Sequence, residues 1–360
     1  MPAVKVVTVP APITARTVAF DVLLRTHSGA WADEVLRPLA VGLHTKDAGL
    51  AHQLVFGCLR FQAQLDFLIT HFAGKTIKLD PEVRIALRLG IFQLRYLDRI
   101  PDHAAVAETV ELVKRARKRS ATGLVNAVLR KVTREPIPFP DRPTALSTPA
   151  WLLDSWTQQH GADQAESIAR TFLIQPEAHF QGDRQMDIGA QSIIPLLDLQ
   201  SGMKMLDLCA APGNKTIQAL ATGADVVACD RYLHRLKQVD CPKRVVLDAT
   251  LVLPFHTLFD RILVDAPCSG TGTLGRNPEI KWRLKPSDID DLAQRQQKIL
   301  TNALALLKPG GRLVYATCSL QAKENEAVVE AVVTGRTEQS FYRIPGLAEG
   351  DGFYAAVITS

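Results

Sequence analysis

Apolar residues recur with the period of an α-helix along the first 132 residues of the chain. From Ala15 onwards they occupy positions i, i+3, i+4, i+7 and i+8, which lie on one face of a helix. Asp80 and Pro81 suit the cap and first turn of another helix. The pattern predicts an all-α region of five or more helices, the later ones over residues 50–67, 81–97, 104–115 and 121–133.

The pattern changes after residue 172. Short apolar runs, bounded by polar or turn residues, suit strands that are buried on both faces of a parallel sheet. They cover residues 203–208, 225–229, 244–247, 261–264 and 312–316, and helical stretches such as 286–307 fit between most of them. Strands that alternate with helices imply a doubly wound α/β sheet of the Rossmann type.

Five prolines fall within residues 134–149, between the two patterns, which is typical of a linker. We therefore predict an all-α domain over residues 1–135, a proline-rich linker over 136–150 and an α/β domain over 151–360. The last of these begins with a helical stretch over residues 151–172. A chain of 360 residues is long enough for about two domains.

Charge is unevenly distributed between the two halves. Residues 1–150 contain 21 Lys and Arg against 13 Asp and Glu, whereas residues 151–360 contain 21 against 24. A basic half joined to a slightly acidic half favours a polyanion-binding module attached to a catalytic one. The densest basic run, residues 114–119, suits either phosphate contact or a solvated helix end.

The sequence gives no indication of a membrane or of export. No apolar run reaches the roughly 20 residues that cross a bilayer, and residues 1–17 lack the features of a signal peptide. The six cysteines include no C-x-x-C pair, so we expect no metal site. The expected protein is cytoplasmic and has reduced thiols.

A strand, a tight turn and a helix start are predicted around residues 205–216. Small residues there let the backbone approach a ligand, and the helix N-terminus presents its amides. Carboxylates follow three later strands, and in a parallel sheet the carboxyl ends of the strands meet at one edge. Ribose hydroxyls and an adenine amino group suit such carboxylates, although a single strand-end Asp is often only a helix cap. A nucleoside cofactor is therefore expected at Cys209, Ala210, Ala211, Pro212, Gly213, Asn214, Lys215, Asp230, Asp248 and Asp265.

Two cysteines also follow predicted strands. Cys268 lies in Asp265-Ala-Pro-Cys-Ser-Gly270, and Cys318 lies in Tyr315-Ala-Thr-Cys-Ser319. Either thiol alone is commonly a small core residue. At the same sheet edge, the two suit a nucleophile and a proton-transfer partner. Cys58, Cys229 and Cys241, and the thiol of Cys209, are expected to be structural.

Together, these motifs resemble the RsmB/Sun family of S-adenosylmethionine-dependent RNA cytosine-carbon-5 methyltransferases. The first half resembles the NusB-like RNA-binding domain of that family, for example at His103-Ala-Ala-Val-Ala-Glu108. The catalytic half matches at Asp207-Leu-Cys-Ala-Ala-Pro-Gly-Asn-Lys-Thr216, Asp265-Ala-Pro-Cys-Ser-Gly-Thr-Gly272, Asn277-Pro-Glu-Ile-Lys-Trp282, Tyr315-Ala-Thr-Cys-Ser319 and Gly350-Asp-Gly-Phe-Tyr354.

The resemblance implies a reaction and roles for the residues. Cys318 would add to carbon 6 of a cytosine, Cys268 would help to release the product, and Asp265 would hydrogen-bond to or protonate ring nitrogen 3. The cofactor would be S-adenosyl-L-methionine and the substrate an RNA, with 16S rRNA expected first. A tRNA or other RNA is the alternative within the enzyme class. Outside it, the alternative is a non-catalytic RNA-binding assembly factor.

Two further expectations concern RNA and assembly. Lys281 and Arg283 flank Trp282 and suit phosphate contact beside a stacking ring, or else two solvated cations beside a packed Trp. The chain is expected to be a monomer.

The sequence departs from the family at Asn214, where a second glycine is usual, and near residues 173–185, where an RNA-binding insert is short. Because Asn tolerates a left-handed backbone, the turn is expected to survive.

Overall fold

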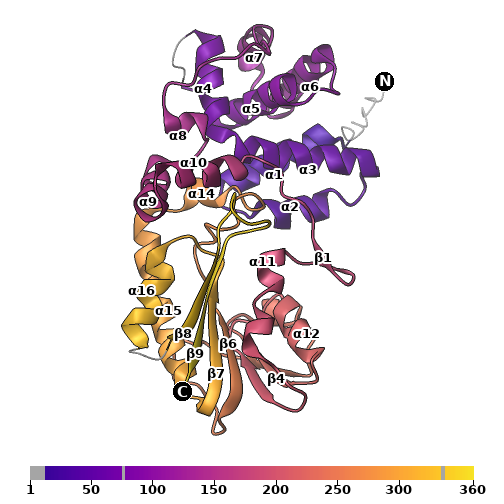
Figure 1. Cartoon of the computed structure of the whole chain (residues 1–360). Coiled ribbons are helices and arrows are strands. Elements are labelled where there is room, and N and C mark those ends of the chain that lie inside the picture. The colour runs from indigo at the N-terminus through magenta and orange to yellow at the C-terminus, as the bar shows by residue number, and fades with distance from the viewer. Residues whose placement is uncertain (1–12, 75–77, 334–336) are drawn as a thin grey trace, which may run out of the picture. The chain divides into compact units, whose positions relative to one another are not determined.

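The computed structural model describes residues 13–74, 78–333 and 337–360, and these form two compact units that divide between Ser147 and Thr148 (Figure 1). The first unit is helical, which confirms the prediction. Its helices are α1 (Ala15–His27), α2 (Ala32–Leu39), α3 (Thr45–Arg60), α4 (Gln62–Ala73), α5 (Pro81–Tyr96), α6 (Asp102–Arg115), α7 (Thr122–Leu129) and α8 (Arg142–Ala145).

One predicted helix is two helices in the structure. Residues 50–67 contain the end of α3 and the start of α4, and the chain turns at Phe61 between them. The amide of Ala63 donates to Ser147 Oγ at 3.0 Å, and Gln64 Nε2 donates to the carbonyl of Ala145 at 2.6 Å. These bonds stabilise the break, because helix termini need partners for their polar groups. Hydrophobic spacing could not reveal them, since the partners lie more than 80 residues away.

The predicted helix start at Pro81 is confirmed, but the expected cap is not formed. Asp80 occupies the N-cap position of α5, and within the described residues its side chain accepts no capping hydrogen bond. Its carboxylate instead lies 2.8 Å from the ammonium of Lys118. The basic run that contains Lys118 is thereby partly neutralised, and Lys114 and Arg115 are paired in the same way with Glu111 and Asp21.

The second unit begins with helices and short elements. The predicted helix over residues 151–172 is again two, α9 (Ala150–His160) and α10 (Ala162–Thr171), because Gly161 between them has a φ of +83°. A small hairpin follows, formed by β1 (Phe180–Gln181) and β2 (Arg184–Gln185). The short helices α11 (Ile188–Gln191) and η2 (Ile194–Leu197) then lead into the main sheet.

The main sheet has the strand order β5-β4-β3-β6-β7-β9-β8. The strands that were predicted as apolar runs, β3 (Lys204–Asp207), β4 (Asp225–Asp230), β5 (Lys243–Val246), β6 (Phe259–Asp265) and β7 (Leu307–Thr317), are parallel. The last two strands, β8 (Thr337–Arg343) and β9 (Phe353–Thr359), are antiparallel and were not predicted. From β3 the chain builds outwards to β5 and then returns to β6 on the other side, which creates a topological switch point.

Apolar side chains alternate between the two faces of this sheet. Leu206, Ile262 and Tyr315 pack into one core cluster, and Met205, Leu263 and Val314 pack into the other. Helices α15 (Pro286–Leu304) and α16 (Glu326–Val332) cover the first face, and α12 (Asn214–Leu220) covers the second (Figure 1). Burial on both faces explains why these strands read as continuous apolar runs, and it confirms the doubly wound fold.

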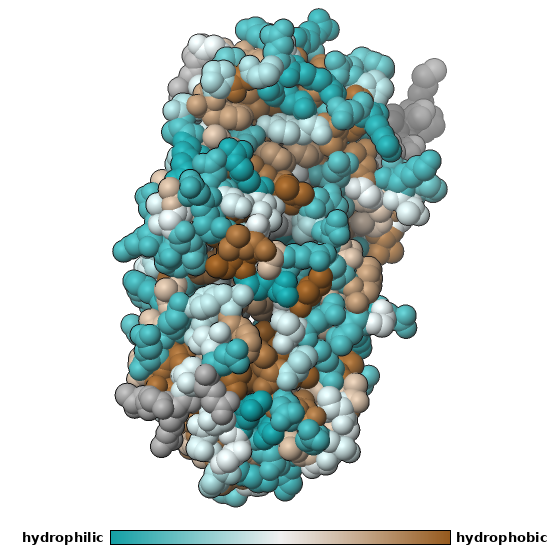
Figure 2. All heavy atoms as spheres, in the orientation of Figure 1, coloured by the Kyte–Doolittle hydropathy of each residue, from teal (hydrophilic) through white to brown (hydrophobic). Residues whose placement is uncertain are grey.

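The surface is mostly hydrophilic on the face drawn in Figure 2, where hydrophobic residues form small separate groups. Along the described part of the chain, the helices are all too short or too polar to span a bilayer.

Two glycines of α3 allow a test of packing in the helical unit. A Cβ at Gly57 would lie 2.0 Å from Cζ of the buried Phe92, whereas a Cβ at Gly49 would meet no atom within 4 Å. We predict that Gly57→Ala destabilises the unit by about 1–3 kcal/mol through overpacking. Gly49→Ala should stabilise it by about 0.5–1 kcal/mol, since alanine favours the helix.

Hydrogen exchange of the α3 amides in the full chain measures both effects. Equal protection in the two variants would contradict the close packing of α3 on α5.

Candidate active site

The carboxyl ends of the central strands converge on one cavity of about 320 Å³. β4 contributes Asp230 and β6 contributes Asp265, while Asp248 and Cys318 lie just beyond the ends of β5 and β7. The loop after β6 adds Cys268. The volume lies within the range of small-molecule sites, and the position is where doubly wound sheets bind ligands.

The loop after β3 lines this cavity and a second one of about 160 Å³. Cys209, Ala211 and Lys215 border both, whereas Ala210, Pro212 and Asn214 border only the second. The left-handed residue of the turn is Gly213, with a φ of +106°, and a Cβ there would lie 3.0 Å from Cα of Val239. Asn214 begins α12 in helical conformation. The turn therefore survives for a different reason from the one expected, since Asn214 need not adopt a left-handed backbone.

The two carboxylates on the β4–β5 side are held by their own loops. Asp230 Oδ1 accepts the amide of Tyr232 at 2.9 Å, and Asp248 Oδ1 accepts the amide and hydroxyl of Thr250 at 3.0 and 2.7 Å. The hydrogen bonds from Thr250, assisted by the nearby Arg231, lower the pKa of Asp248. Both side chains are thus pre-oriented as hydrogen-bond acceptors at the cavity wall.

Lys215 and Asp265 form an ion pair at the centre of the site, with 2.7 Å between Nζ and Oδ2. Burial disfavours the charged ammonium, but the negative charge and hydrogen bond of Asp265 outweigh it and raise the pKa of Lys215. The ring of Phe353 lies 5.6 Å from the same ammonium. Lys215 therefore stays positively charged and holds the carboxylate of Asp265 in place.

Asp207, at the end of β3, is a buried carboxyl that sequence reasoning did not single out as a functional residue. It is 1% exposed, and its Oδ2 accepts the hydroxyl of Thr216 at 2.7 Å. Burial raises the pKa of Asp207 to about 7, against the opposing hydrogen bond from Thr216. The group thus lies near its midpoint at neutral pH, on the wall of the smaller cavity.

The sulfur atoms of Cys268 and Cys318 lie 3.3 Å apart at the edge of the larger cavity. The hydrogen bond with Cys318, together with burial, raises the pKa of Cys268 well above that of an ordinary thiol. The loops that carry the two cysteines are also joined, because the amide of Gly272 donates to the carbonyl of Cys318 at 2.9 Å. Cys58, Cys229 and Cys241 are buried away from this pair in core positions.

Several cavity-lining residues were missed by sequence reasoning. They include Tyr232, Arg235, Thr273, Arg295 and Phe353. Phe353 lies in the Gly350–Tyr354 motif, and Tyr232 comes two residues after Asp230, so proximity to a motif was an available signal for these two. Arg295 lies in the middle of α15, where nothing in the sequence distinguishes it from a solvated charge.

The two residues expected to contact RNA differ in exposure. Arg283 is half-buried, but Lys281 is 1% exposed, and its ammonium lies 5.1 Å from the centroid of the Trp282 ring. Lys281 is thus packed against Trp282 and not solvated, and RNA contact stays a prediction for both Lys281 and Arg283.

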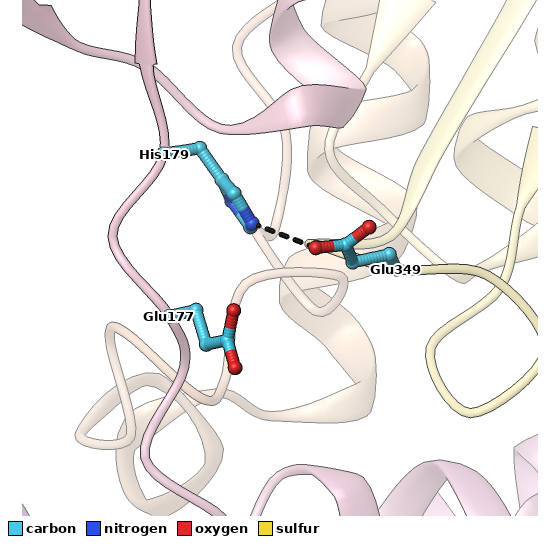
Figure 3. Close-up of side chains that lie close together, drawn as sticks. All are labelled: Glu177, His179 and Glu349. Atoms are coloured by element: carbon cyan, nitrogen blue, oxygen red, sulfur yellow. Dashed lines mark hydrogen bonds and ion pairs between the residues drawn. The ribbon is translucent and has the colours of Figure 1, made fainter.

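Within the described residues, one group could share a metal ion: Glu177, His179 and Glu349 (Figure 3). His179 Nε2 lies 3.1 Å from Glu349 Oε1, and its Nδ1 lies 3.7 Å from Asp187 Oδ2. Figure 3 shows Glu177 beside this pair with no hydrogen bond to it. Both glutamates are exposed, and Nε2 of His179 is hydrogen-bonded to Glu349.

The sheet, the loop after β3 and the strand-end carboxylates define a Rossmann-like methyltransferase unit, and a helical unit precedes it. The family described as 16S rRNA methyltransferase RsmB/F matches residues 194–358, and the NusB family matches residues 13–134. The chain belongs to the RsmB/F family of ribosomal RNA methyltransferases. It is an S-adenosylmethionine-dependent RNA methyltransferase with an N-terminal NusB-type region, as the sequence motifs predicted.

Similar proteins extend over most of the chain. Ribosomal RNA small subunit methyltransferase B of Cronobacter sakazakii is 33% identical, with 89% of this chain and 92% of that protein covered. The protein of the same name from Escherichia coli is 34% identical, with 91% and 94% covered. The crystal structure of PH0851 has a TM-score of 0.78 at 20% identity, with 98% and 100% covered, and so shares the fold.

The match with the Cronobacter protein runs over 398 positions, more than the 360 residues of this chain. That relative therefore contains segments that this chain lacks. Between α10 and α11, where a short insert was expected, the structure has only the β1–β2 hairpin and its flanking loops.

The cavity fits S-adenosylmethionine by the chemistry of its walls. Asp230 and Asp248 offer carboxylate acceptors of the kind that ribose hydroxyls and an adenine amino group require. Leu247, Ala249 and Ile299 supply apolar surface beside them.

Replacing Asp230 tests this assignment. In Asp230→Asn the amide oxygen can still accept a hydrogen bond from the Tyr232 amide. The second carboxylate oxygen is replaced by an NH2 group, which can only donate. We predict that S-adenosylmethionine binds about ten- to hundredfold more weakly, as measured by isothermal titration calorimetry. Asp225→Asn is the matched control, because Asp225 lies at the other end of β4 and pairs with Lys243. Similar losses in both variants would contradict a cofactor contact at Asp230.

The thiol pair yields a pH-dependent prediction. A raised pKa means that the Cys268 thiolate forms only at higher pH than that of an ordinary cysteine, so iodoacetamide should alkylate Cys268 only at high pH. In Cys318→Ala the main cause of that shift is absent, and alkylation of Cys268 should move to lower pH. Mass spectrometry of peptides from the free protein provides the measurement. An unchanged Cys268 profile in the variant would contradict coupling of the two thiols.

Proposed function

We propose that this protein methylates carbon 5 of a cytosine in 16S rRNA through a covalent adduct with Cys318. The observation that carries the proposal is the 3.3 Å separation of two cysteine sulfurs beside a cavity that also contains Asp265 and Lys215. A methyltransferase that modifies an oxygen or nitrogen atom needs no paired thiols. Carbon 5 of cytosine is a poor nucleophile and gains reactivity from thiol addition.

In the first step the Cys318 thiolate adds to carbon 6. The new sulfur–carbon bond displaces the electrons of the carbon 5–carbon 6 double bond, which makes carbon 5 nucleophilic. A proton taken up from solvent at ring nitrogen 3 would offset the added negative charge, and the Asp265 carboxylate would accept a hydrogen bond from it. Lys215 keeps Asp265 oriented through their 2.7 Å contact. Bound S-adenosylmethionine supplies the electrophilic methyl group that carbon 5 takes up.

Cys268 then removes the proton from carbon 5, directly or through a water molecule. Its pKa is high in the free protein chiefly because of the hydrogen bond with Cys318. Once Cys318 is a thioether in the adduct, the largest cause of the raised pKa is gone, so Cys268 can transfer its thiol proton to a water molecule and then act as a base in its thiolate form. Loss of the carbon 5 proton re-forms the double bond, breaks the sulfur–carbon bond and returns Cys318 as a thiolate.

The RNA has to present an unpaired or flipped base to reach the cysteines. The basic charge of residues 1–150 supports binding of this substrate by the helical unit. The names of the related proteins favour small-subunit rRNA over tRNA.

Methyl transfer from tritium-labelled S-adenosylmethionine to unmethylated 16S rRNA tests the proposal, with tRNA as a parallel substrate. We predict label at carbon 5 of cytosine, a loss of at least about a thousandfold in Cys318→Ala, and protein–RNA adducts that persist on a denaturing gel in Cys268→Ala. Cys241→Ala is the control, since this thiol is bonded to backbone carbonyls away from the cavity.

Label in tRNA alone would move the substrate to that class. Full activity of Cys318→Ala would overturn the covalent mechanism. Binding of RNA and cofactor without transfer to any RNA would favour the non-catalytic alternative.

A further inference from the structure

A buried carboxylate joins the two cysteine loops. Glu324 ends the short helix η3 (Ala322–Glu324) and is 0% exposed. Its Oε1 accepts the amide of Ser269 at 2.8 Å and Nε2 of Gln296 at 3.0 Å. Its Oε2 accepts the hydroxyls of Ser319, at 2.6 Å, and of Ser269. Four donors thus surround one carboxylate, which satisfies a buried charge.

Three of these four donors belong to the residues that directly follow the two cysteines. Ser269 is next to Cys268, and Ser319 is next to Cys318. The two hydroxyls also lie 3.1 Å from each other. A displacement of the carboxylate would therefore move both loops, and with them the two sulfur atoms.

The carboxylate is itself fixed from two sides. Gln296 projects from α15 and also donates to the carbonyl of Pro267 at 2.9 Å. The hydroxyl of Tyr315, from β7, donates to the backbone carbonyl of Glu324 at 2.6 Å. Glu324 is therefore held in place between the sheet and α15.

We infer that Glu324 is a positioning residue of the methyl-transfer site: its carboxylate binds the residue that follows each cysteine and so sets the separation of the two thiols. The inference rests on the proposed function for its catalytic meaning. The part of the inference that concerns the separation of the thiols applies to the free protein and does not depend on that function.

The charge of Glu324 acts in the same direction as the geometry. After the hydrogen bond with Cys318, burial and the charge of Cys318, the charge of Glu324 further raises the pKa of Cys268. The other titratable groups nearby are Tyr315, whose pKa is also raised by burial, and the Lys215–Asp265 pair on the side of Cys318. The negative charge of Glu324 thus disfavours the thiolate of Cys268.

Two variants separate charge from geometry. Glu324→Gln keeps the volume and one acceptor oxygen for Ser269 and Gln296, while its amide can donate to the two hydroxyls, so mainly the charge is lost. Glu324→Ala removes the whole clamp. Glu330→Gln is the matched control, because Glu330 lies on the neighbouring helix α16 and is exposed.

The first measurement is the pH profile of iodoacetamide alkylation in the full chain without substrate. We expect half-maximal alkylation of Cys268 to move down by about one pH unit in Glu324→Gln and to stay unchanged in Glu330→Gln. A purely structural role would not produce a shift specific to Cys268. A folded Glu324→Gln protein with the wild-type profile would overturn the inference.

The second measurement is methyl transfer to RNA. We expect kcat to fall about ten- to hundredfold in Glu324→Ala, with KM for RNA and for S-adenosylmethionine unchanged, and Glu324→Gln to restore part of the loss. An increase in KM alone would contradict a positioning role. If Glu324→Ala does not fold, both the alkylation profile and methyl transfer are measured with Glu324→Gln. Failure of the wild type to methylate cytosine would refute the proposed function, while the alkylation comparison would still decide the role of Glu324.

Discussion

The carboxylate of Glu324, buried and surrounded by four donors, is the constraint on which the geometry of the site depends. Transferring a carboxylate from water into a protein interior is costly unless hydrogen bonds replace those to water. Here three of the four donors belong to residues that directly follow the two cysteines. The hydrogen bonds that satisfy the buried charge therefore also align the sulfur atoms. A loop that moved away would leave a buried charge without its partners, which opposes local disorder in this part of the site.

The sheet supplies the second requirement, a common edge for groups that lie far apart in the chain. Parallel strands β3, β4, β5, β6 and β7 end on the same side, so residues from 208 to 318 meet around one cavity. Their side chains alternate between two core clusters, which holds each strand in a single register. The positions of Asp230, Asp265 and Cys318 follow from that register, since a shift of one residue would turn each side chain to the opposite face.

Much of this could be predicted from the sequence, for identifiable reasons. Strands buried on both faces leave uninterrupted apolar runs, and residues that follow such runs can be assigned to the sheet edge; Cys268, Cys318 and the three aspartates were found in this way. β8 was missed because it lies at the sheet edge and begins with four polar residues, Thr337 to Ser340. β9 was missed although residues 353–358 form a buried apolar run like those of the parallel strands. The breaks at Phe61 and Gly161 were missed because a helical period can continue across a short turn. The burial of Lys281 was not predicted, since its sequence looks basic and solvated. Glu324 could not be found at all, because its partner Ser269 lies 55 residues away.

The C-terminal strand pair has a consequence for the order in which the protein is made. The amide of Gly352 donates to the carbonyl of Gly272 at 2.8 Å, and a Cβ at Gly272 would lie 2.2 Å from the carbonyl oxygen of Gly352, so the Cys268 loop is packed directly against the start of β9. Phe353, the next residue, lines the cavity beside Lys215. On the ribosome, where synthesis proceeds from the N-terminus, the cysteines and carboxylates all emerge before these residues do. The nascent chain therefore cannot pack the Cys268 loop against Gly352, or complete the cavity wall with Phe353, until both residues have left the exit tunnel.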